Sequence, residues 1–281
     1  MIKIIPFLII GFSCIGCTHA QSIKVITYNI RYDNPNDGEN WWEVRKEYLA
    51  KQVKFHEPDI MGIQEGLSRQ VNYLDSSLVS YSYVGVGRDD GKTKGEYSAI
   101  FYKTEKFEVV DQSTFWLSKT PSKPTVGWDA SMERICTYAL LKEIQTGKSL
   151  WVFNTHFDHI GQVARDSSAR LIVKKIRNLN AVNYPVVVMG DLNLEPSSKT
   201  IKYLSGEFND ARYESEGVVF GPEGTYNGFN FSQPVTRRID YIFTDKEKIK
   251  VNKYAVLSDS KDLKYPSDHL PVFVEISLIA Q

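Results

Sequence analysis

The clearest structural signal in the chain is the segment Val186-Val187-Val188-Met189-Gly190-Asp191-Leu192-Asn193. A short apolar run this rich in valine predicts a strand over residues 185–190 that is buried on both faces. Alternate residues of an extended chain face the same way, so Asp191 and Asn193 should project together where the strand ends, and Gly190 permits a close backbone approach. A functional site at the end of a buried sheet is one interpretation, and an Asx turn that leads into the next helix is the other.

The hydrophobic pattern on either side of this strand alternates between strand and helix spacing. Strands are predicted over residues 23–30, 59–64, 81–87, 97–102, 107–110, 134–143, 149–155, 185–190, 238–244 and 272–278. Helices are predicted over residues 42–56, 68–78, 162–180 and 197–204. No repeat or Pro/Ser-rich linker interrupts the series. The pattern predicts a single α/β domain over residues 21–281, with mixed β-sheets covered by helices.

The charge composition limits the classes of substrate and partner. The 281 residues carry 34 basic and 34 acidic side chains, which gives a formal net charge of zero. No broad positive field is available for a long polyanion, so we expect no stable duplex nucleic-acid partner. A small phosphorylated substrate remains compatible, because a bound metal ion can supply local positive charge. The oligomeric state is not predictable from these features.

The first 20 residues resemble an export signal. Lys3 precedes an apolar run over residues 4–15, which is shorter than the roughly 20 apolar residues of a membrane-spanning helix. Two processing routes are open: cleavage after Ala20, or lipidation of Cys17. Both predict export to the periplasm or cell surface of a bacterium, or attachment as an outer-membrane lipoprotein. Cys136 is then the only certain cysteine, so we expect no disulfide framework and no cysteine metal site.

Polar residues also end other predicted strands. Asn29 ends the first strand, Glu65 follows the second, and Asn154 and His156 end a later one. Sheet proteins build sites at strand ends, and a carboxylate such as Glu65 suits a hard cation. The alternative for Glu65 is a charge that favours the dipole of the following helix.

The C-terminal part adds two fragments. Ser267-Asp268-His269-Leu270-Pro271 precedes an apolar strand, and Arg238-Ile239-Asp240-Tyr241 places a carboxylate inside another. A buried carboxylate needs a partner. Asp240 either orients the imidazole of His269 and favours its protonated form, or it pairs with Arg238 while His269 serves only in a turn.

Together these fragments resemble the endonuclease/exonuclease/phosphatase superfamily, which includes deoxyribonuclease I. The fragments occur in the family order as Thr27-Tyr28-Asn29-Ile30, Ile63-Gln64-Glu65, Asn154-Thr155-His156, Gly190-Asp191-Leu192-Asn193, Arg238-Ile239-Asp240-Tyr241 and Ser267-Asp268-His269. The resemblance implies a four-layer α-β-β-α sandwich of two mixed β-sheets covered by helices, with the site at one edge of the packed sheets.

The resemblance also implies a role for each residue. Glu65, helped by Asn29 and Asp268, would hold Mg²⁺ or Mn²⁺. Asp191 would deprotonate or orient the attacking water, and Asn193 would position the phosphate.

Two histidines complete the implied machinery. His156 and His269, the latter paired with Asp240, would stabilise charge on the phosphoryl oxygens. These roles meet the requirements of water attack on phosphorus, namely positioning, charge neutralisation and a poised base.

Within the superfamily, residues 95–100, Trp128 and residues 134–137 most resemble the nocturnin and carbon catabolite repressor deadenylase branch and its bacterial relatives. Substrate contacts are predicted for Glu96, Tyr97, Arg134, Trp42, Trp128, Asn154, Asn227 and Phe229. The alternatives are a strand-edge tyrosine, a surface arginine and aromatic rings that pack in the core.

His159 lies three residues after His156 and could share a zinc site with it. A loop histidine that caps the helix over residues 162–180 is the favoured interpretation.

The expected protein is thus an exported, metal-dependent hydrolase of phosphate esters, with a nuclease-like phosphodiesterase as the first choice. A sphingomyelinase-like or inositol-phosphatase-like hydrolase of lipid or sugar phosphates is the alternative. A surface binding protein that keeps the fold without catalysis is a third possibility, although every acidic and imidazole position of the family pattern is filled.

Overall fold

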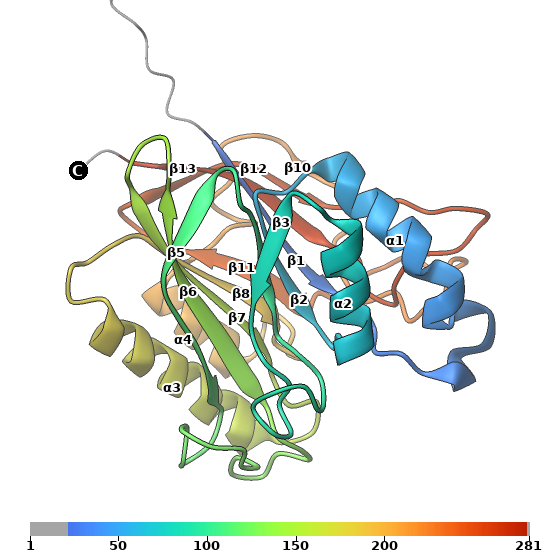
Figure 1. Ribbon diagram of the computed structural model, residues 1–281, viewed down its shortest axis with the longest axis horizontal. Helices are drawn as coiled ribbons and strands as arrows, with labels where there is room; N and C mark the ends of the chain where they lie inside the picture. The colour runs from blue at the N-terminus through green and yellow to red at the C-terminus, as the bar shows by residue number, and fades with distance from the viewer. Residues whose placement is uncertain (1–21, 280–281) are drawn as a thin grey trace, which may run out of the picture.

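The computed structural model describes residues 22–279, and the predicted leader lies outside these residues. Two β-sheets lie between helices, with α1 (Trp42–His56) and α2 (Ser68–Ser77) on one side and α3 (Gln162–Leu179) and α4 (Lys199–Glu207) on the other (Figure 1). No helix in the described range is long and apolar enough to cross a membrane. The predicted four-layer sandwich is confirmed.

Both sheets mix parallel and antiparallel strands. The seven-stranded sheet has the order β10-β12-β13-β1-β2-β4-β3, and the six-stranded sheet has the order β5-β6-β7-β8-β11-β9. The first contains β1 (Ile23–Asn29), β2 (Ile60–Gln64), β3 (Tyr81–Val84), β4 (Ile100–Lys103), β10 (Val219–Phe220), β12 (Ile249–Val256) and β13 (Val272–Leu278). The second contains β5 (Phe107–Trp116), β6 (Ile135–Glu143), β7 (Ser149–His156), β8 (Val186–Asp191), β9 (Asn209–Asp210) and β11 (Asp240–Thr244). A 3-10 segment, η1 (Pro35–Asn40), precedes α1.

Three apolar clusters separate the four layers. The largest lies between the sheets and includes Val25 of β1 and Val187 of β8. A second joins the outer face of the six-stranded sheet to Ile172 of α3. The third joins the outer face of the seven-stranded sheet to Leu49 of α1 and Leu74 of α2. These residues are at most 1% exposed, so the burial of apolar surface holds the layers together.

The register of β8 determines where the site lies. Asp191 pairs with His156 on the neighbouring strand β7 and with Asp240 on β11. Gly190 has a φ of 146°, and a Cβ atom there would lie 1.9 Å from the carbonyl oxygen of Thr155, so only glycine fits. Three chemistry-bearing side chains therefore lie in a row across adjacent strands.

Several predicted boundaries were wrong. The strand predicted over 81–87 ends at Val84, because Gly85 takes a φ of 133° that turns the chain. The strand predicted over 107–110 continues to Trp116 through an irregular register between Val109 and Asp111. β12 was missed because lysines interrupt its apolar residues, although they face outward while Ile249 and Val251 are buried.

Candidate active site

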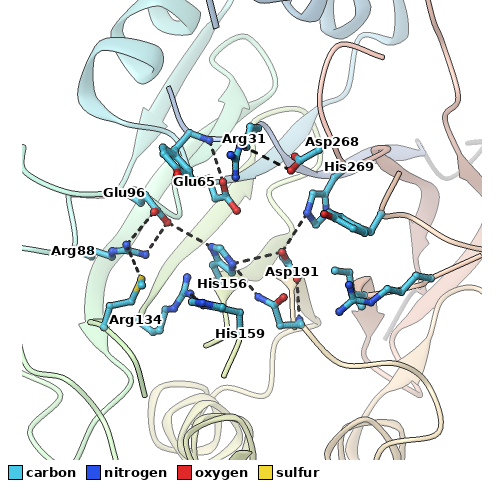
Figure 2. A pocket seen from close by; sticks show the side chains of 16 residues that line it. Arg31, Glu65, Arg88, Glu96, Arg134, His156, His159, Asp191, Asp268 and His269 are labelled. Carbon is cyan, nitrogen blue, oxygen red and sulfur yellow. Dashed lines mark hydrogen bonds and ion pairs between the residues drawn. The ribbon is translucent and has the colours of Figure 1, made fainter. Parts of the chain in front are cut away.

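A cavity of about 570 Å³ opens where the strands of both sheets end. Eight of the predicted site residues line it: Glu65, Glu96, Arg134, His156, Asp191, Asn193, Asp268 and His269. Figure 2 shows Arg88, Glu96 and Arg134 together on one side of His156, with Asp268 and His269 on the other. Residues from the first strand to the last thus converge on one polar cavity.

Asn29 joins two carboxylates beside this cavity. Its Nδ2 donates to Glu65 Oε1 and to Asp191 Oδ2, each at 3.0 Å, and its Oδ1 accepts from the backbone N–H of Arg31. The Arg31 bond fixes the orientation of the amide, because only an oxygen can accept there. Asn29 is therefore placed to orient Glu65 and Asp191 rather than to offer its oxygen between them.

Three residues at the cavity have the left-handed backbone conformation that side chains other than glycine rarely adopt. The φ angles are 55° at Arg31, 64° at Glu65 and 50° at Asn193. Such conformations cost on the order of 1 kcal/mol each and persist where the surrounding structure enforces them. The backbone of Glu65 is anchored through its side chain, since Oε2 accepts from the N–H of Tyr32 at 3.0 Å.

Asp191 is almost fully buried and has three polar neighbours besides Asn29. Its Oδ1 accepts from the N–H of Asn193 at 2.8 Å, which is the Asx turn considered from the sequence. Its Oδ2 lies 3.5 Å from His156 Nε2 and 3.7 Å from His269 Nε2. Burial raises the pKa of Asp191, and the charge of Asp240 adds to the rise. The Asx turn and a chemical role are therefore compatible at this residue.

His269 pairs with Asp240, which decides between the two interpretations of these residues. The distance from His269 Nδ1 to Asp240 Oδ2 is 2.8 Å, whereas Arg238 pairs with Asp210. Thr225 Oγ1 donates to the same Asp240 oxygen. Burial alone would lower the pKa of His269, but the charge and hydrogen bond of Asp240 raise that pKa well above its ordinary value. His269 is a cation at neutral pH.

His156 is held in one neutral tautomer. Asn193 Nδ2 donates to the carbonyl of Phe157 at 3.0 Å, which fixes the amide, and lies 3.1 Å from His156 Nε2. Nε2 must then accept, so the proton resides on Nδ1. Burial, together with the charge of Arg134, lowers the pKa of His156 to about 3. His156 Nδ1 is buried without a hydrogen-bond partner and points toward Glu96, 3.7 Å away.

The carboxylates beside Arg31 suit a divalent metal. Glu65 and Asp268 both line the cavity, and Arg31 Nε lies 4.0 Å from Asp268 Oδ2. Burial raises the pKa of Asp268 to about 6, and the charge of Glu65 adds to the rise. A buried and a half-buried carboxylate that repel one another fit a hard cation such as Mg²⁺ or Mn²⁺, which takes oxygen ligands. Glu65 also belongs to an acid and histidine cluster with His156 and Asp191 whose ligand atoms lie within 4.8 Å of one another.

Two arginines, Arg88 and Arg134, lie on the side of the cavity opposite to Asp268 and His269. Arg88 forms a two-bond ion pair with Glu96, at 2.7 and 2.9 Å. Arg134 lies 3.4 Å from Asp158 and 3.0 Å from His159 Nδ1. Within the described residues, Arg88 Nε and Arg134 Nη1 are buried without hydrogen-bond partners, and Asp89 Oδ1 lies 3.8 Å from Arg88 Nε. These unpartnered donors, like His156 Nδ1, lie on residues that line the cavity.

Six predicted substrate contacts do not line this cavity. Trp42 is 1% exposed and packs against Tyr73 in the core, which corrects the prediction that it stacks on substrate. Asn154 is fully buried between the two sheets, and its Nδ2 donates to the carbonyls of Ile63 and Ala99. It therefore cannot contact a substrate.

The remaining four have local roles. The Tyr97 hydroxyl donates to the carbonyl of Lys92, and Asn227 Nδ2 donates to the carbonyl of Ser267. Trp128 is half-buried, and the Phe229 ring lies 5.8 Å from Arg45 Cζ. Position in a loop did not distinguish aromatic rings at the cavity from rings that pack nearby.

His159 also departs from its favoured interpretation. The backbone N–H groups of Val163 and Ala164 donate to Asp129, so Asp129 and not His159 caps α3. His159 instead lines the cavity beside Arg134. Among residues 22–279, neither cluster able to hold a metal includes His159, which leaves the zinc interpretation without support.

Eight residues of the lining were not among the predicted site residues: Arg31, Tyr32, Arg88, Met132, His159, Tyr226, Arg237 and Ile239. Arg31 directly follows the Asn29 fragment, and Arg237 directly precedes the Asp240 fragment. Their positions next to these motifs could have identified both as candidate site residues. Arg88 directly follows the strand predicted over residues 81–87, so the strand-end pattern could have identified it as well.

The comparisons with known proteins agree with this geometry. The model of the Endonuclease/Exonuclease/phosphatase family matches residues 26–269. The chain belongs to this family. Its members are phosphoesterases, and the match spans every residue from Asn29 to His269 that converges on the cavity.

Solved structures of family members superpose closely. An endonuclease/exonuclease/phosphatase family protein of Bacteroides thetaiotaomicron is 37% identical with a TM-score of 0.89, over 92% of this chain and 99% of that one. A mannosyl-6-phosphatase of the same organism is 37% identical with a TM-score of 0.87, over 91% of this chain and 100% of that one.

A more distant relative is the Ccr4 3'-5'-exoribonuclease subunit of the Candida glabrata CCR4-Not complex. It is 24% identical over 296 residues, which cover 82% of this chain and 33% of that protein. The chain thus spans about a third of this curated relative. The predicted resemblance to the family and to its deadenylase branch is confirmed.

Proposed function

We propose that this family member hydrolyses a sugar phosphomonoester by metal-assisted attack of water. The observation that carries the proposal is the convergence of Glu65, His156, Asp191 and His269 on one cavity. The similarity to a mannosyl-6-phosphatase over nearly the full length of both chains supports a phosphorylated sugar as the substrate.

The side chains divide the chemistry among them. A divalent cation held by Glu65 and Asp268 would neutralise charge on the phosphoryl group. Asp191 accepts the proton of the attacking water, and its raised pKa brings it closer to neutral pH as a base. His269, charged through its pair with Asp240, donates to a phosphoryl oxygen.

His156 contributes a second donor on the other side. Asn193 holds its Nε2, so the unpartnered Nδ1–H is available to a phosphoryl oxygen. In this arrangement Asn193 positions His156, since both of its amide hydrogens are used within the protein.

The unpartnered donors favour a monoester over a diester. His156 Nδ1, Arg88 Nε and Arg134 Nη1 are buried without acceptors on residues that line the cavity. Buried donors need acceptors, and a substrate must supply them. A phosphomonoester dianion offers three terminal oxygens, one more than a diester.

A nuclease-like phosphodiesterase is the second candidate. The similarity to the exoribonuclease subunit Ccr4 favours it. The balance of 34 basic and 34 acidic residues weighs against a long polyanion and limits this candidate to nucleotides or short single strands.

A substrate panel tests the proposal. Mannose 6-phosphate, bis(p-nitrophenyl) phosphate, short oligoadenylates, sphingomyelin and inositol phosphates are incubated with Mg²⁺, Mn²⁺ or EDTA, and Asp191→Ala serves as the inactive control. We expect the sugar phosphate to be the best substrate and EDTA to abolish turnover. Faster hydrolysis of diesters or oligonucleotides would favour the second candidate, and binding without hydrolysis would favour a non-catalytic protein.

We also propose that the chain is exported, on the strength of the first 20 residues alone. The mass of the mature protein tests this. A lipid-bearing Cys17 would indicate a lipoprotein, whereas an unmodified Gln21 terminus would indicate cleavage after Ala20. Retention of Met1 in the mature chain would contradict export.

A further inference from the structure

Arg45 is a buried cation beneath the candidate metal site. It belongs to α1 and is 5% exposed, and among residues 22–279 no carboxylate is a hydrogen-bond partner of its guanidinium. Its guanidinium donates instead to backbone carbonyls: those of Asn40 at 2.8 Å, Ile30 at 2.6 Å, Arg31 at 2.7 Å and Pro266 at 3.0 Å. A buried charge without an ionic partner is expensive, so a specific reason for its presence is expected.

These carbonyls belong to the two segments that carry the candidate metal site. Ile30 and Arg31 follow Asn29, whose amide holds Glu65, and Pro266 lies two residues before Asp268. The bond from Arg45 to Pro266 joins positions 221 residues apart in the chain. Arg45 therefore connects the segment that follows Asn29 with the segment that precedes Asp268.

A second contact reinforces the same junction. Ser267 Oγ donates to the carbonyl of Asn29 at 2.7 Å. The backbone on both sides is thus tied twice, by Arg45 and by Ser267, immediately beside Asn29 and Asp268. Hydrogen bonds behind the ligands of a metal site orient those ligands.

We propose that Arg45 is a positioning residue for cation binding, because it fixes the spacing between the Asn29–Glu65 side and the Asp268 side of the site. The inference rests on the proposed metal-dependent function. Arg45 acts through backbone carbonyls and does not touch the substrate.

Only arginine can make this set of contacts. A guanidinium presents five N–H donors in one plane, whereas a lysine ammonium has three donors at a single point. Burial lowers the pKa of Arg45 to about 10, so the group stays charged at neutral pH. The positive charge also favours the ionised form of Asp268.

The matched control is a buried hydrogen bond at the other end of the same sheet. Tyr81 donates its hydroxyl to the carbonyl of Pro58 at 2.6 Å. Pro58 precedes β2, whereas Glu65 follows it. Tyr81→Phe therefore removes a buried side-chain bond to a carbonyl without touching the metal side.

The experiment measures Mn²⁺ binding to the full chain by calorimetry and the Mn²⁺ dependence of turnover. Arg45→Met should weaken Mn²⁺ binding by about tenfold or more. Saturating Mn²⁺ should restore most of kcat. Arg45→Lys, which keeps the charge but not the planar fork, should lie between Arg45→Met and the wild type, and should be used alone if Arg45→Met does not fold. Tyr81→Phe should lower the melting temperature without changing Mn²⁺ affinity.

Two outcomes would overturn the inference and are distinguishable. Normal Mn²⁺ affinity in a folded Arg45 variant, with a wild type that binds Mn²⁺, would refute the role of Arg45 alone. A wild type that binds no Mn²⁺ would refute the proposed metal-dependent function and this inference with it.

Discussion

His269 Nδ1 lies 2.8 Å from Asp240 Oδ2, and both side chains are buried. The sheet register places Asp240 beside Asp191, whose Oδ2 is 3.7 Å from the other ring nitrogen of His269. One imidazole thus lies between two carboxylates. The carboxylate of Asp240 raises the pKa of His269 and favours its protonated form, and that of Asp191 faces the cavity.

Asp240→Asn should therefore remove the proton from His269 at neutral pH. Burial lowers the pKa of this histidine once the Asp240 charge no longer opposes it. We expect kcat/KM at pH 7 to fall by about 10² to 10⁴, as for loss of a general acid. The alkaline limb of the pH–rate profile should move to lower pH. Thr225→Val, which removes only the hydroxyl donor to Asp240, should shift this limb less, and an unmoved limb in Asp240→Asn would refute the role of the pair.

Asp191→Asn should lower turnover without lowering the melting temperature. Turnover should fall by roughly 10³ because the base is lost. The melting temperature should hold or rise, since burial and the charge of Asp240 both disfavour the Asp191 carboxylate.

The control for this variant is Asp210→Asn, which breaks the buried two-bond ion pair with Arg238. It should lower the free energy of unfolding by about 3–5 kcal/mol, because a buried guanidinium loses its partner. Thermal melts and steady-state rates of both variants check the contrast. Near-normal turnover in Asp191→Asn would exclude this residue as the base.

Metal affinity should depend on pH through Asp268. The pKa of this residue is raised to about 6 in the metal-free protein, so below that pH a proton competes with the cation. The dissociation constant for Mn²⁺ should be constant above about pH 7 and should rise roughly tenfold per pH unit below pH 6. Calorimetric titrations from pH 5 to 8 measure this. An affinity that is flat across the range would argue against Asp268 as a ligand.

Cys136 should be chemically inert. The thiol is fully buried in β6, and burial raises its pKa well above the ordinary value. Iodoacetamide should leave the native protein unmodified, and Cys136→Ala should keep full turnover while losing about 1 kcal/mol of unfolding free energy. Mass spectrometry and activity after treatment test this, and inactivation by the reagent would assign Cys136 a chemical role.

The α/β class and the polar strand ends were predictable because both follow from local patterns, whereas the four-layer sandwich was implied by the family resemblance. Val187 and its neighbours reveal a buried strand, and Asp191 marks where it ends. Glu65 could be found in the same way. These signals lie within a few residues, so no knowledge of strand order is needed.

Apart from the Asp240–His269 pair, contacts between distant segments could not be predicted from local patterns. In the sequence, Arg45 cannot be distinguished from the other charged residues of its helix. Its partners are backbone carbonyls of separate loops, which no local pattern reveals. Arg88 follows a predicted strand, but its pairing with Glu96 depends on the path of the loop between them. Trp42 was misassigned because its place at the start of α1 does not reveal that it faces the core.

The central claim is a single cation site that holds a phosphoryl group against two histidines. A crystal structure of the chain soaked with Mn²⁺ and inorganic phosphate, with anomalous data collected near the manganese edge, tests it most directly. We expect one anomalous peak about 2.1 Å from carboxylate oxygens of Glu65 and Asp268, with phosphate oxygens on His156 and His269. A manganese peak elsewhere, or phosphate bound away from both histidines, would contradict it.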